Sequence, residues 1–301
     1  MTEFLAERVV RAHAKINLVL RVLAREANGY HGIETVLQRL ALHDVVRVKL
    51  GGHARTLSCS GSAMPSEGLG NEQDNLAWRA AEAYAHEISW DVDWQIGIDK
   101  RIPVGGGLGG GSADAAAVLR AMEAMSPTPL GASALLSLAG TLGADVPFCM
   151  TGAHLALAWG RGDRVFALPA LPRMAVTLIT FADGVSTARA YAELARRRAN
   201  NEHIGALGAH AYATNAFGSW ESVCRLATND FESVVAGFHP GVAATLSQVR
   251  AAADQVTQTG VPAIGMMSGS GATCVVVHPE SVPVDLPGID PRTITRTATT
   301  S

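Results

Sequence analysis

The chain has 301 residues, of which 48% are hydrophobic and 17% are charged, with 24 basic side chains against 27 acidic ones and a net charge of −3. This balance excludes a basic surface for nucleic acid and an acidic disordered tail, so we expect a folded protein with no nucleic-acid partner. The length predicts two domains or one large domain.

Strand and helix patterns alternate along the whole chain. Apolar residues at every second position indicate strands, whereas apolar stripes between capping residues and glycine stops indicate helices. In the first half we expect a strand at 8–24, strands within 33–50, a loop at 51–71, a helix at 75–87 capped by Asp74, a short strand at 95–98, an alanine-rich helix ending near Met125 and a helix at 133–142 stopped by Gly143. In the second half we expect strands at 153–159, 164–168 and 174–181, a helix at 187–198 capped by Ser186 or Thr187, helices at 219–227, 229–236 and 241–257, strands at 262–267 and 272–277, and an extended or frayed stretch over the last two dozen residues.

The segment over 103–116 carries six glycines within seven positions and leads directly into the alanine-rich helix. Glycine lets a ligand approach main-chain amides closely, and a helix N-terminus attracts negative charge, so the segment predicts a phosphate site and not a flexible linker. It lacks the Gly-Lys-Ser/Thr ending of a Walker A motif. It also lies too far along the chain for the first turn of a dinucleotide-binding fold.

Several polar residues have two interpretations from sequence alone. Asp145 follows a glycine stop and precedes Pro147, so it is either a catalytic carboxylate or a helix cap. Lysine is scarce, with only Lys15, Lys49 and Lys100 among 24 basic residues, so a remaining lysine either performs a task that arginine cannot or has survived by chance. Lys100 beside Arg101 could equally form a solvated pair. Likewise, the turn at 268–271 could be a plain hairpin.

The order and spacing of eight motifs resemble the GHMP kinase superfamily, and within it the branch that phosphorylates a cytidine diphosphate-linked methylerythritol in the non-mevalonate route to isoprenoids. The motifs are Ala14-Lys15-Ile16-Asn17-Leu18, Asn28-Gly29-Tyr30-His31, Asp74-Asn75-Leu76, the glycine segment from Pro103 to Ala116, Leu142 to Phe148, Gly184 to Thr187, Asn229-Asp230-Phe231-Glu232, and Ser268-Gly269-Ser270-Gly271.

The resemblance implies a two-domain α+β GHMP kinase fold with the active site in the cleft between the domains. The N-terminal, ATP-binding domain is expected at 1–168 and the C-terminal domain at 169–301. The implied activity is transfer of a phosphoryl group from ATP, with Mg²⁺, to the 2-hydroxyl of the cytidyl substrate. The alternatives are another small-molecule kinase of the superfamily and a nucleotide-binding regulator without turnover.

The resemblance also implies the site residues. Lys15 and Asp145 match the catalytic positions, and Ser112 is expected near magnesium, whose ligands stay unknown. The ATP-binding positions are Asn75, Lys100, Pro103, Gly105, Gly106, Gly107, Leu108, Gly109, Gly110, Gly111 and Ser112. The substrate-binding positions are Asn17, Tyr30, His31, Asp145, Tyr191, Gly269 and Ser270. In this scheme Tyr30 and Tyr191 stack on cytosine while His31 reads its edge.

The compartment is expected to be the cytoplasm. The four cysteines are scattered without a Cys-x-x-Cys pair, which is typical of buried free thiols in a reducing compartment. No apolar run reaches the roughly 18 to 20 residues that span a bilayer, and charged residues precede the first apolar stretch, so we expect no membrane segment and no signal peptide. We expect a monomer or a homodimer.

Overall fold

The computed structural model describes residues 4–25, 31–200, 202, 204, 212–213 and 215–301. The chain divides into two compact units, each assembled from separate segments. Unit 1 comprises Met1–Ala14, Leu42–Val104 and Gly109–Gly152, and unit 2 comprises Lys15–Ala41, Gly105–Leu108 and Ala153–Ser301. The domain boundary expected after residue 168 stays a prediction.

Two long strands, β1 (Phe4–Arg25) and β2 (His31–Gly51), contribute residues to both units. The other elements of unit 1 are β3 (Thr56–Ser60), η1 (Glu72–Asp74), α1 (Leu76–Glu87), β4 (Trp94–Asp99), α2 (Gly110–Met125), α3 (Ala132–Leu142) and α4 (Val146–Met150). The other elements of unit 2 are β5 (Leu155–Gly160), β6 (Arg164–Leu168), β7 (Ala175–Ile179), α5 (Thr187–Ala199), α6 (Trp220–Leu226), β8 (Thr228–Asn229), α7 (Glu232–Ala236), α8 (Pro240–Thr257), β9 (Ile264–Met267), β10 (Cys274–His278), η2 (Pro291–Thr293) and β11 (Ile294–Ala298).

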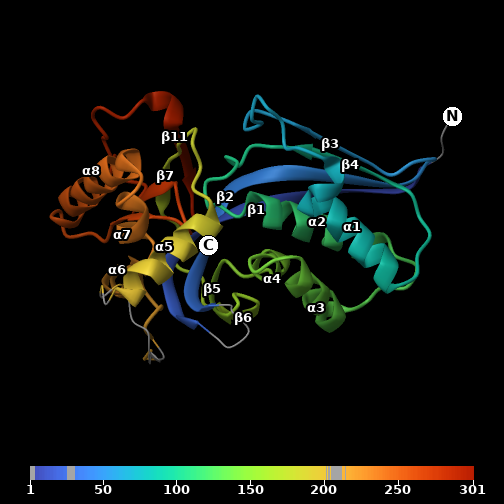
Figure 1. Cartoon of the computed structure of the whole chain (residues 1–301), viewed down its shortest axis with the longest axis horizontal. Coiled ribbons are helices and arrows are strands. Elements are labelled where there is room, and N and C mark those ends of the chain that lie inside the picture. The colour runs from blue at the N-terminus through green and yellow to red at the C-terminus, as the bar shows by residue number, and fades with distance from the viewer. Residues whose placement is uncertain (1–3, 26–30, 201, 203, 205–211, 214) are drawn as a thin grey trace. The chain divides into compact units, whose positions relative to one another are not determined.

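In unit 1, helices cover one face of a sheet. Strand β4 pairs antiparallel with β2 and parallel with β3, and its alternate residues Trp94, Ile96 and Ile98 are buried. Figure 1 shows α1 to α4 on the same side of β3 and β4. Helix α2 packs against α1 and α4, and its buried face consists largely of alanine. Small side chains let these helices approach closely, which buries α2 on most of its circumference.

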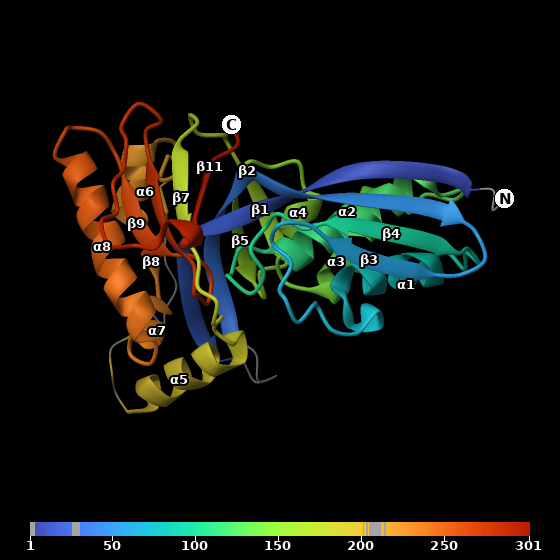
Figure 2. The same cartoon turned by 90° about the horizontal axis from the view of Figure 1, so that it is seen from above.

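In unit 2, the first sheet continues and a second sheet is added. Strand β5 pairs antiparallel with β2 and with β6, while β8 pairs parallel with β1. The second sheet has the order β11-β7-β10-β9, with all neighbouring strands antiparallel. Helix α8 packs against β9 and β10, and Figure 2 shows α8 beside β9.

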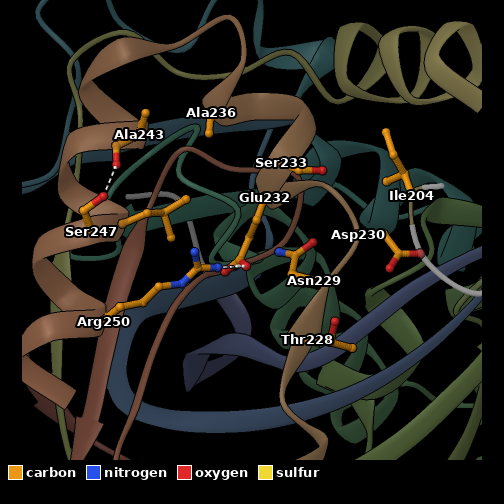
Figure 3. A pocket seen from close by; sticks show the side chains of 11 residues that line it. Ile204, Thr228, Asn229, Asp230, Glu232, Ser233, Ala236, Ala243, Ser247 and Arg250 are labelled. Atoms are coloured by element: carbon orange, nitrogen blue, oxygen red, sulfur yellow. Dashed lines mark hydrogen bonds and ion pairs between the residues drawn. The ribbon is translucent and has the colours of Figure 1, made fainter. Parts of the chain in front are cut away.

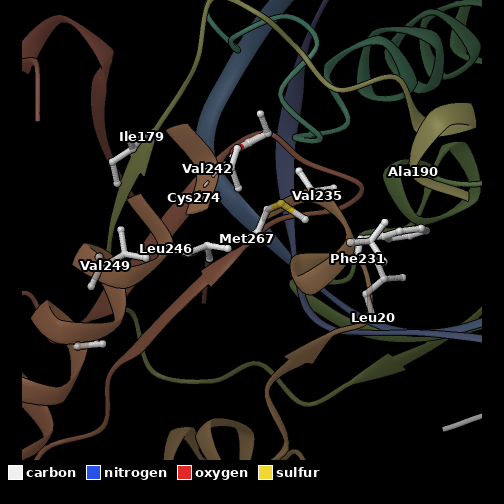
Figure 4. Packing of buried hydrophobic residues seen from close by; sticks show 14 of the residues in the cluster. Leu20, Ile179, Ala190, Phe231, Val235, Val242, Leu246, Val249, Met267 and Cys274 are labelled. Carbon is white, nitrogen blue, oxygen red and sulfur yellow. Dashed lines mark hydrogen bonds between the residues drawn. The ribbon is translucent and has the colours of Figure 1, made fainter. Parts of the chain in front are cut away.

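The core of unit 2 joins α7 and α8 to the strands. Figure 4 shows Phe231, which precedes α7, together with Val235 of α7, Leu246 of α8, Met267 of β9 and Leu20 of β1 in one buried cluster. Removing such side chains from water contributes about 1.5–3 kcal/mol each, which is enough to hold short elements such as α7 in place. The segment between β8 and β9 is thereby fixed against β1.

Most expected elements are found within a few residues, but several features differ, among them helix α4, which was not expected. The cap of α1 is Asn75, whose side chain accepts from the N–H of Ala77, whereas Asp74 ends the preceding 3₁₀ turn, so the prediction of Asp74 as the cap is wrong. The expected loop at 51–71 contains β3. The C-terminal stretch contains strand β11, which pairs with β7, so it is extended and not frayed there. The two-residue strand β8 was not expected.

Within the described part of the chain, no helix is both long and apolar enough to cross a membrane.

Candidate functional site

The glycine segment consists of a left-handed turn region followed by the first turn of helix α2. Gly105, Gly107 and Gly109 have φ of +75°, +73° and +72°, a left-handed backbone that favours glycine. Helix α2 begins at Gly110, and its N-cap residue Gly109 makes no side-chain capping hydrogen bond. The first-turn amides of α2 therefore lack the usual side-chain acceptor. The uncapped N-terminus of this 16-residue helix is compatible with an anion, and the phosphate site at this position stays a prediction.

The first half of the glycine segment packs on the turn that joins β9 to β10. The hydroxyl of Ser268 donates to the carbonyl of Gly107 at 3.4 Å. A Cβ on Gly107 would lie 2.7 Å from the carbonyl oxygen of Ser268, so only glycine fits at this contact. Met267 and Cys274 pair across the turn, so it is a hairpin that also contacts the glycine segment. The hairpin interpretation of the turn at 268–271 is therefore confirmed, whereas its substrate contacts through Gly269 and Ser270 stay a prediction.

Lys15 and Asn17 form a buried polar pair on β1. Their exposed fractions are 4% and 3%, and the Lys15 Nζ donates to the Asn17 Oδ1 at 2.8 Å. The Asn17 Nδ2 donates in turn to the Thr35 Oγ1 at 2.8 Å, and that hydroxyl donates to the carbonyl of Val19 at 2.6 Å. The exposed-strand interpretation of Lys15 is therefore wrong. The chain of hydrogen bonds fixes the orientation of the amide that holds the ammonium.

Thr35 was missed by the sequence reasoning. Its signal is a polar residue directly before Val36 and Leu37 in the expected strand, and Thr35 is 1% exposed on β2.

Asp145 precedes α4 at the N-cap position, with φ −86° and ψ −14°. Its side chain makes no capping hydrogen bond, although the next three residues are buried. The carboxylate is half-buried and does not act as the helix cap that the alternative interpretation required. Asp145 belongs to unit 1 and Lys15 belongs to unit 2.

Lys100 lies in a buried ion cluster and not at a solvated edge. Its Nζ donates to the Asp114 Oδ2 at 2.7 Å and to the Asp44 Oδ2, and all three side chains are at most 5% exposed. The interpretation of Lys100 and Arg101 as a solvated pair is therefore wrong. Burial alone would lower the pKa of Lys100, but the charges of Asp114 and Asp44 outweigh it and raise the pKa.

The same cluster supports the start of α2. A Cβ on Gly110 would lie 3.4 Å from the Lys100 Nζ, so the ammonium lies beneath the first turn of the helix. The Asp44 Oδ1 accepts from the backbone N–H groups of Arg101 and Ile102, at 2.6 and 2.7 Å, just before the glycine segment. Asp44, which was missed, is an acidic residue of β2 directly before the apolar pair Val45-Val46. Lys100 as an ATP contact stays a prediction.

Asn75 uses its side chain locally. Its Oδ1 accepts from the N–H of Ala77 at 2.9 Å, and its Nδ2 lies 4.0 Å from the Sγ of Cys59. Burial raises the pKa of the Cys59 thiol to about 11, so it is protonated near neutral pH. Asn75 as an ATP contact also stays a prediction.

The aromatic residues expected to recognise the base lie in unit 2. His31 and Tyr191 stack with ring centroids 5.6 Å apart and an interplanar angle of 26°. Tyr191 is on α5, whose cap is Ser186, and its ring also meets Phe231 edge-on at 4.8 Å. Tyr30 lies outside the described residues. The rings of His31, Tyr191 and Phe231 therefore form one group of aromatic side chains, with Tyr191 in contact with the other two.

Among the described residues, no three His, Cys, Asp or Glu side chains converge on a point where they could hold a metal ion. Ser112, expected near magnesium, is in the first turn of α2.

Comparison with known proteins matches the chain along nearly its whole length. Residues 75–153 match the family model of the GHMP kinases N terminal domain. A 4-diphosphocytidyl-2-C-methyl-D-erythritol kinase of Rhodococcus jostii (strain RHA1) is 37% identical over 282 residues, covering 91% of this chain and 84% of that protein.

Two solved structures show the same fold. A crystal structure of 4-(cytidine 5'-diphospho)-2C-methyl-D-erythritol kinase superposes with a TM-score of 0.69 at 28% identity, covering 97% of this chain and 98% of that one. The mevalonate kinase of L. major in complex with R-mevalonate superposes with a TM-score of 0.65 at 13% identity, covering 99% and 98%, and supports the fold alone. The expected α+β GHMP kinase fold is confirmed.

Proposed function

Because the chain belongs to the GHMP kinases, and within them to the 4-diphosphocytidyl-2-C-methyl-D-erythritol kinase family, we propose that it transfers the γ-phosphoryl group of ATP to the 2-hydroxyl of 4-diphosphocytidyl-2-C-methyl-D-erythritol. The products are the 2-phosphate and ADP, in isoprenoid precursor biosynthesis. The observation that carries the proposal is the match at 37% identity along 91% of the chain. As a member of this family the chain is an ATP-dependent kinase.

The proposed ATP site is the glycine segment and the start of α2. Uncapped amides at Gly110, Gly111 and Ser112 suit the phosphate oxygens, because they offer donors and a partial positive charge. The remaining ATP contacts proposed are Asn75, Lys100, Pro103, Gly105, Gly106, Gly107, Leu108 and Gly109.

Magnesium would reach this site with ATP, because Mg²⁺ is usually held by substrate phosphates, waters and only one or two protein groups. The Ser112 hydroxyl, on the turn that faces the phosphates in this proposal, fits that limited role. When bound, the ion would neutralise phosphate charge.

Asp145 is proposed as the base that accepts the proton of the substrate hydroxyl. The Asp145 side chain is half-buried and does not cap its own helix, and a carboxylate within hydrogen-bond reach of a substrate hydroxyl can act as a general base. Lys15 is proposed to stabilise negative charge on the transferred group. Its ammonium is buried and oriented by Asn17, so its position needs no rearrangement during the reaction.

The proposed substrate contacts are Asn17, Tyr30, His31, Asp145, Tyr191, Gly269 and Ser270. Stacking on Tyr191 suits any pyrimidine, so discrimination of cytosine requires a hydrogen-bonding group such as the His31 ring. The His31 Nδ1 lies 3.3 Å from the carbonyl of Leu23, an acceptor that favours a proton on that nitrogen. The Nε2 of that tautomer is then an acceptor, which matches the amino group of cytosine.

The test is a coupled assay of ADP release with the cytidyl substrate and a panel of other alcohols, using the wild type and Asp145→Asn. We expect turnover with the cytidyl substrate alone, and a fall in kcat of about 10²-fold or more in the variant, because the isosteric amide cannot accept a proton. Turnover with a different alcohol would assign another substrate of the superfamily. ATP binding without ADP release would indicate a regulator. Near-normal kcat in Asp145→Asn would refute the role of the base.

A further inference from the structure

The turn at Ser268–Gly271 is held by side chains from outside its own sheet. Met267, the last residue of β9, donates its N–H to the Glu232 Oε1 at 2.7 Å. The Asn229 Nδ2 donates to the carbonyls of Met267 and Gly269, each at 2.8 Å. Because β9 is at the edge of the second sheet, these two side chains occupy the place of a further strand along it.

Asn229 is itself fixed on its other side. Its exposed fraction is 5%, and its Oδ1 accepts from the N–H of Phe231 at 3.0 Å. Its backbone belongs to β8, which pairs in parallel with β1 so that Asn229 lies opposite Leu20. Strand β1 also carries Lys15 and Asn17. Asn229 therefore connects the strand of the proposed catalytic lysine, which its backbone pairs with, to the hairpin turn, which its side chain binds.

The turn has little room to move without disturbing its other neighbours. The Ser268 Oγ accepts from the N–H of Asn17 at 3.4 Å and donates to the carbonyl of Gly107 at the same distance. A Cβ on Gly269 would lie 3.1 Å from the Gly107 carbonyl oxygen and 3.6 Å from the Asn17 Oδ1. A shift of the turn by a fraction of an ångström would change all of these contacts.

We propose that Asn229 is a positioning residue, which holds the Gly269-Ser270 turn at the distance from Lys15 and Asn17 that the substrate requires. The inference rests on the proposed function, because that function identifies the substrate that the turn would contact. It assigns a role to Asn229, which had none in the motif analysis. Glu232 is the second anchor. Figure 3 shows Asn229 and Glu232 on the wall of a pocket of about 490 Å³, with Glu232 paired to Arg250.

Asn229→Asp is the sharpest variant, because it keeps the shape and replaces the two N–H donors with an oxygen that faces two carbonyl oxygens. Asp230→Asn is the matched control. Asp230 is the next residue, is 7% exposed, and accepts from the N–H of Val22 while pairing with Arg198. None of these contacts involves the turn. Asn229→Ala, which removes the donors without adding charge, replaces Asn229→Asp if that variant does not fold.

The first measurement is hydrogen–deuterium exchange of peptides covering 264–275, which needs no activity. We expect exchange in this segment to rise about tenfold or more in the Asn229 variant, because the lost hydrogen bonds lower the cost of opening the turn. The Asp230 control should stay close to the wild type there. Unchanged exchange at the turn in the Asn229 variant would overturn the inference.

The second measurement is steady-state kinetics of folded protein. We expect the Asn229 variant to lose about tenfold or more in kcat/KM for the cytidyl substrate, mostly through KM, because the turn is displaced from the bound geometry. The Asp230 control should lose much less. Equal losses in both variants would show a general structural role and overturn the inference. If the wild type shows no cytidyl kinase activity, the proposed function fails, and the exchange result alone then decides the role of Asn229.

Discussion

Replacing Asp114 with asparagine tests the buried cluster beneath the first turn of α2. Burial raises the pKa of Asp114 from 3.8 to about 7, the attraction to Lys100 opposes this rise, and the charge of Asp44 adds to it. The cluster holds two carboxylates around one ammonium, so one carboxylate has no compensating charge. Asparagine at 114 keeps the shape of the protonated acid and removes the surplus charge.

The sign and size of the pH effect follow from proton binding. Below pH 3.8 Asp114 is protonated in both the folded and the unfolded chain, so its pKa shift has no effect on the free energy of unfolding there. Between pH 3.8 and about 7 only the folded chain holds the proton, so stability falls as the pH rises, and above about 7 the loss is constant. At about 1.4 kcal/mol per pH unit, the loss is about 4 kcal/mol in all and about 3 kcal/mol between pH 5 and 7.

The assay is urea unfolding of the wild type and Asp114→Asn from pH 5 to pH 8. We expect the free energy of unfolding of the variant, relative to the wild type, to rise by about 3 kcal/mol over this range. Other groups with raised pKa values, such as Asp230 and Glu232, titrate in both proteins and cancel in the difference. The difference should persist in about 0.5 M sodium chloride, because salt screens buried charges weakly. If the free energies of unfolding of the wild type and Asp114→Asn differ by the same amount at every pH, the reasoning is refuted.

Three further predictions concern the proposed site. Lys15→Met should lower kcat more than it raises either KM, since the ammonium acts on the transition state, and a pure KM effect in steady-state kinetics would make Lys15 a ground-state binding residue. His31→Ala should remove most of a roughly 10- to 100-fold preference in kcat/KM for the cytidyl substrate over its uridyl analogue, and an unchanged ratio would place base recognition elsewhere. Gly107→Ala should lower the free energy of unfolding by about 1–3 kcal/mol, because φ is +73° and the new Cβ would lie 2.7 Å from the Ser268 carbonyl. Gly111→Ala, where a Cβ meets open space in the first turn of α2, is the matched control in thermal unfolding and should show no loss.

Features that depend on neighbouring residues were predictable from the sequence. Gly143 ends α3, and Ser186 caps α5 through a hydrogen bond to Arg189, because stops and caps are decided within one turn of helix. The shared face of Lys15 and Asn17 followed from the two-residue period of a strand, and their hydrogen bond agrees with it. The choice between Asp74 and Asn75 as the cap was wrong, because both are good caps and the preceding 3₁₀ turn decides between them.

Features that depend on distant residues were not predictable from one sequence. The burial of Lys100 requires Asp44, which is 56 positions earlier on another strand. Strand β3 forms because β4 offers it an edge, although Leu57 is the only large apolar side chain in β3. The role of Asn229 depends on carbonyls 38 and 40 positions away. Local patterns carry no information on such pairings. The sequence therefore placed Asn229 in a family motif but did not indicate which groups its side chain binds.

The interleaved composition of the two units bears on how the chain folds during synthesis. Strands β1 and β2 are synthesised before the other described elements, yet residues 15–25 of β1 and 31–41 of β2 belong to a unit whose other parts follow only after residue 104. All segments of unit 1 have been synthesised by residue 152, whereas β7 receives its outer neighbour β11 only when residues 294–298 emerge. Neither unit is one continuous stretch of polypeptide, so neither can be produced alone by cutting the gene at a single point. A split-protein experiment on this chain would have to separate the polypeptide within a connecting loop and recombine both pieces.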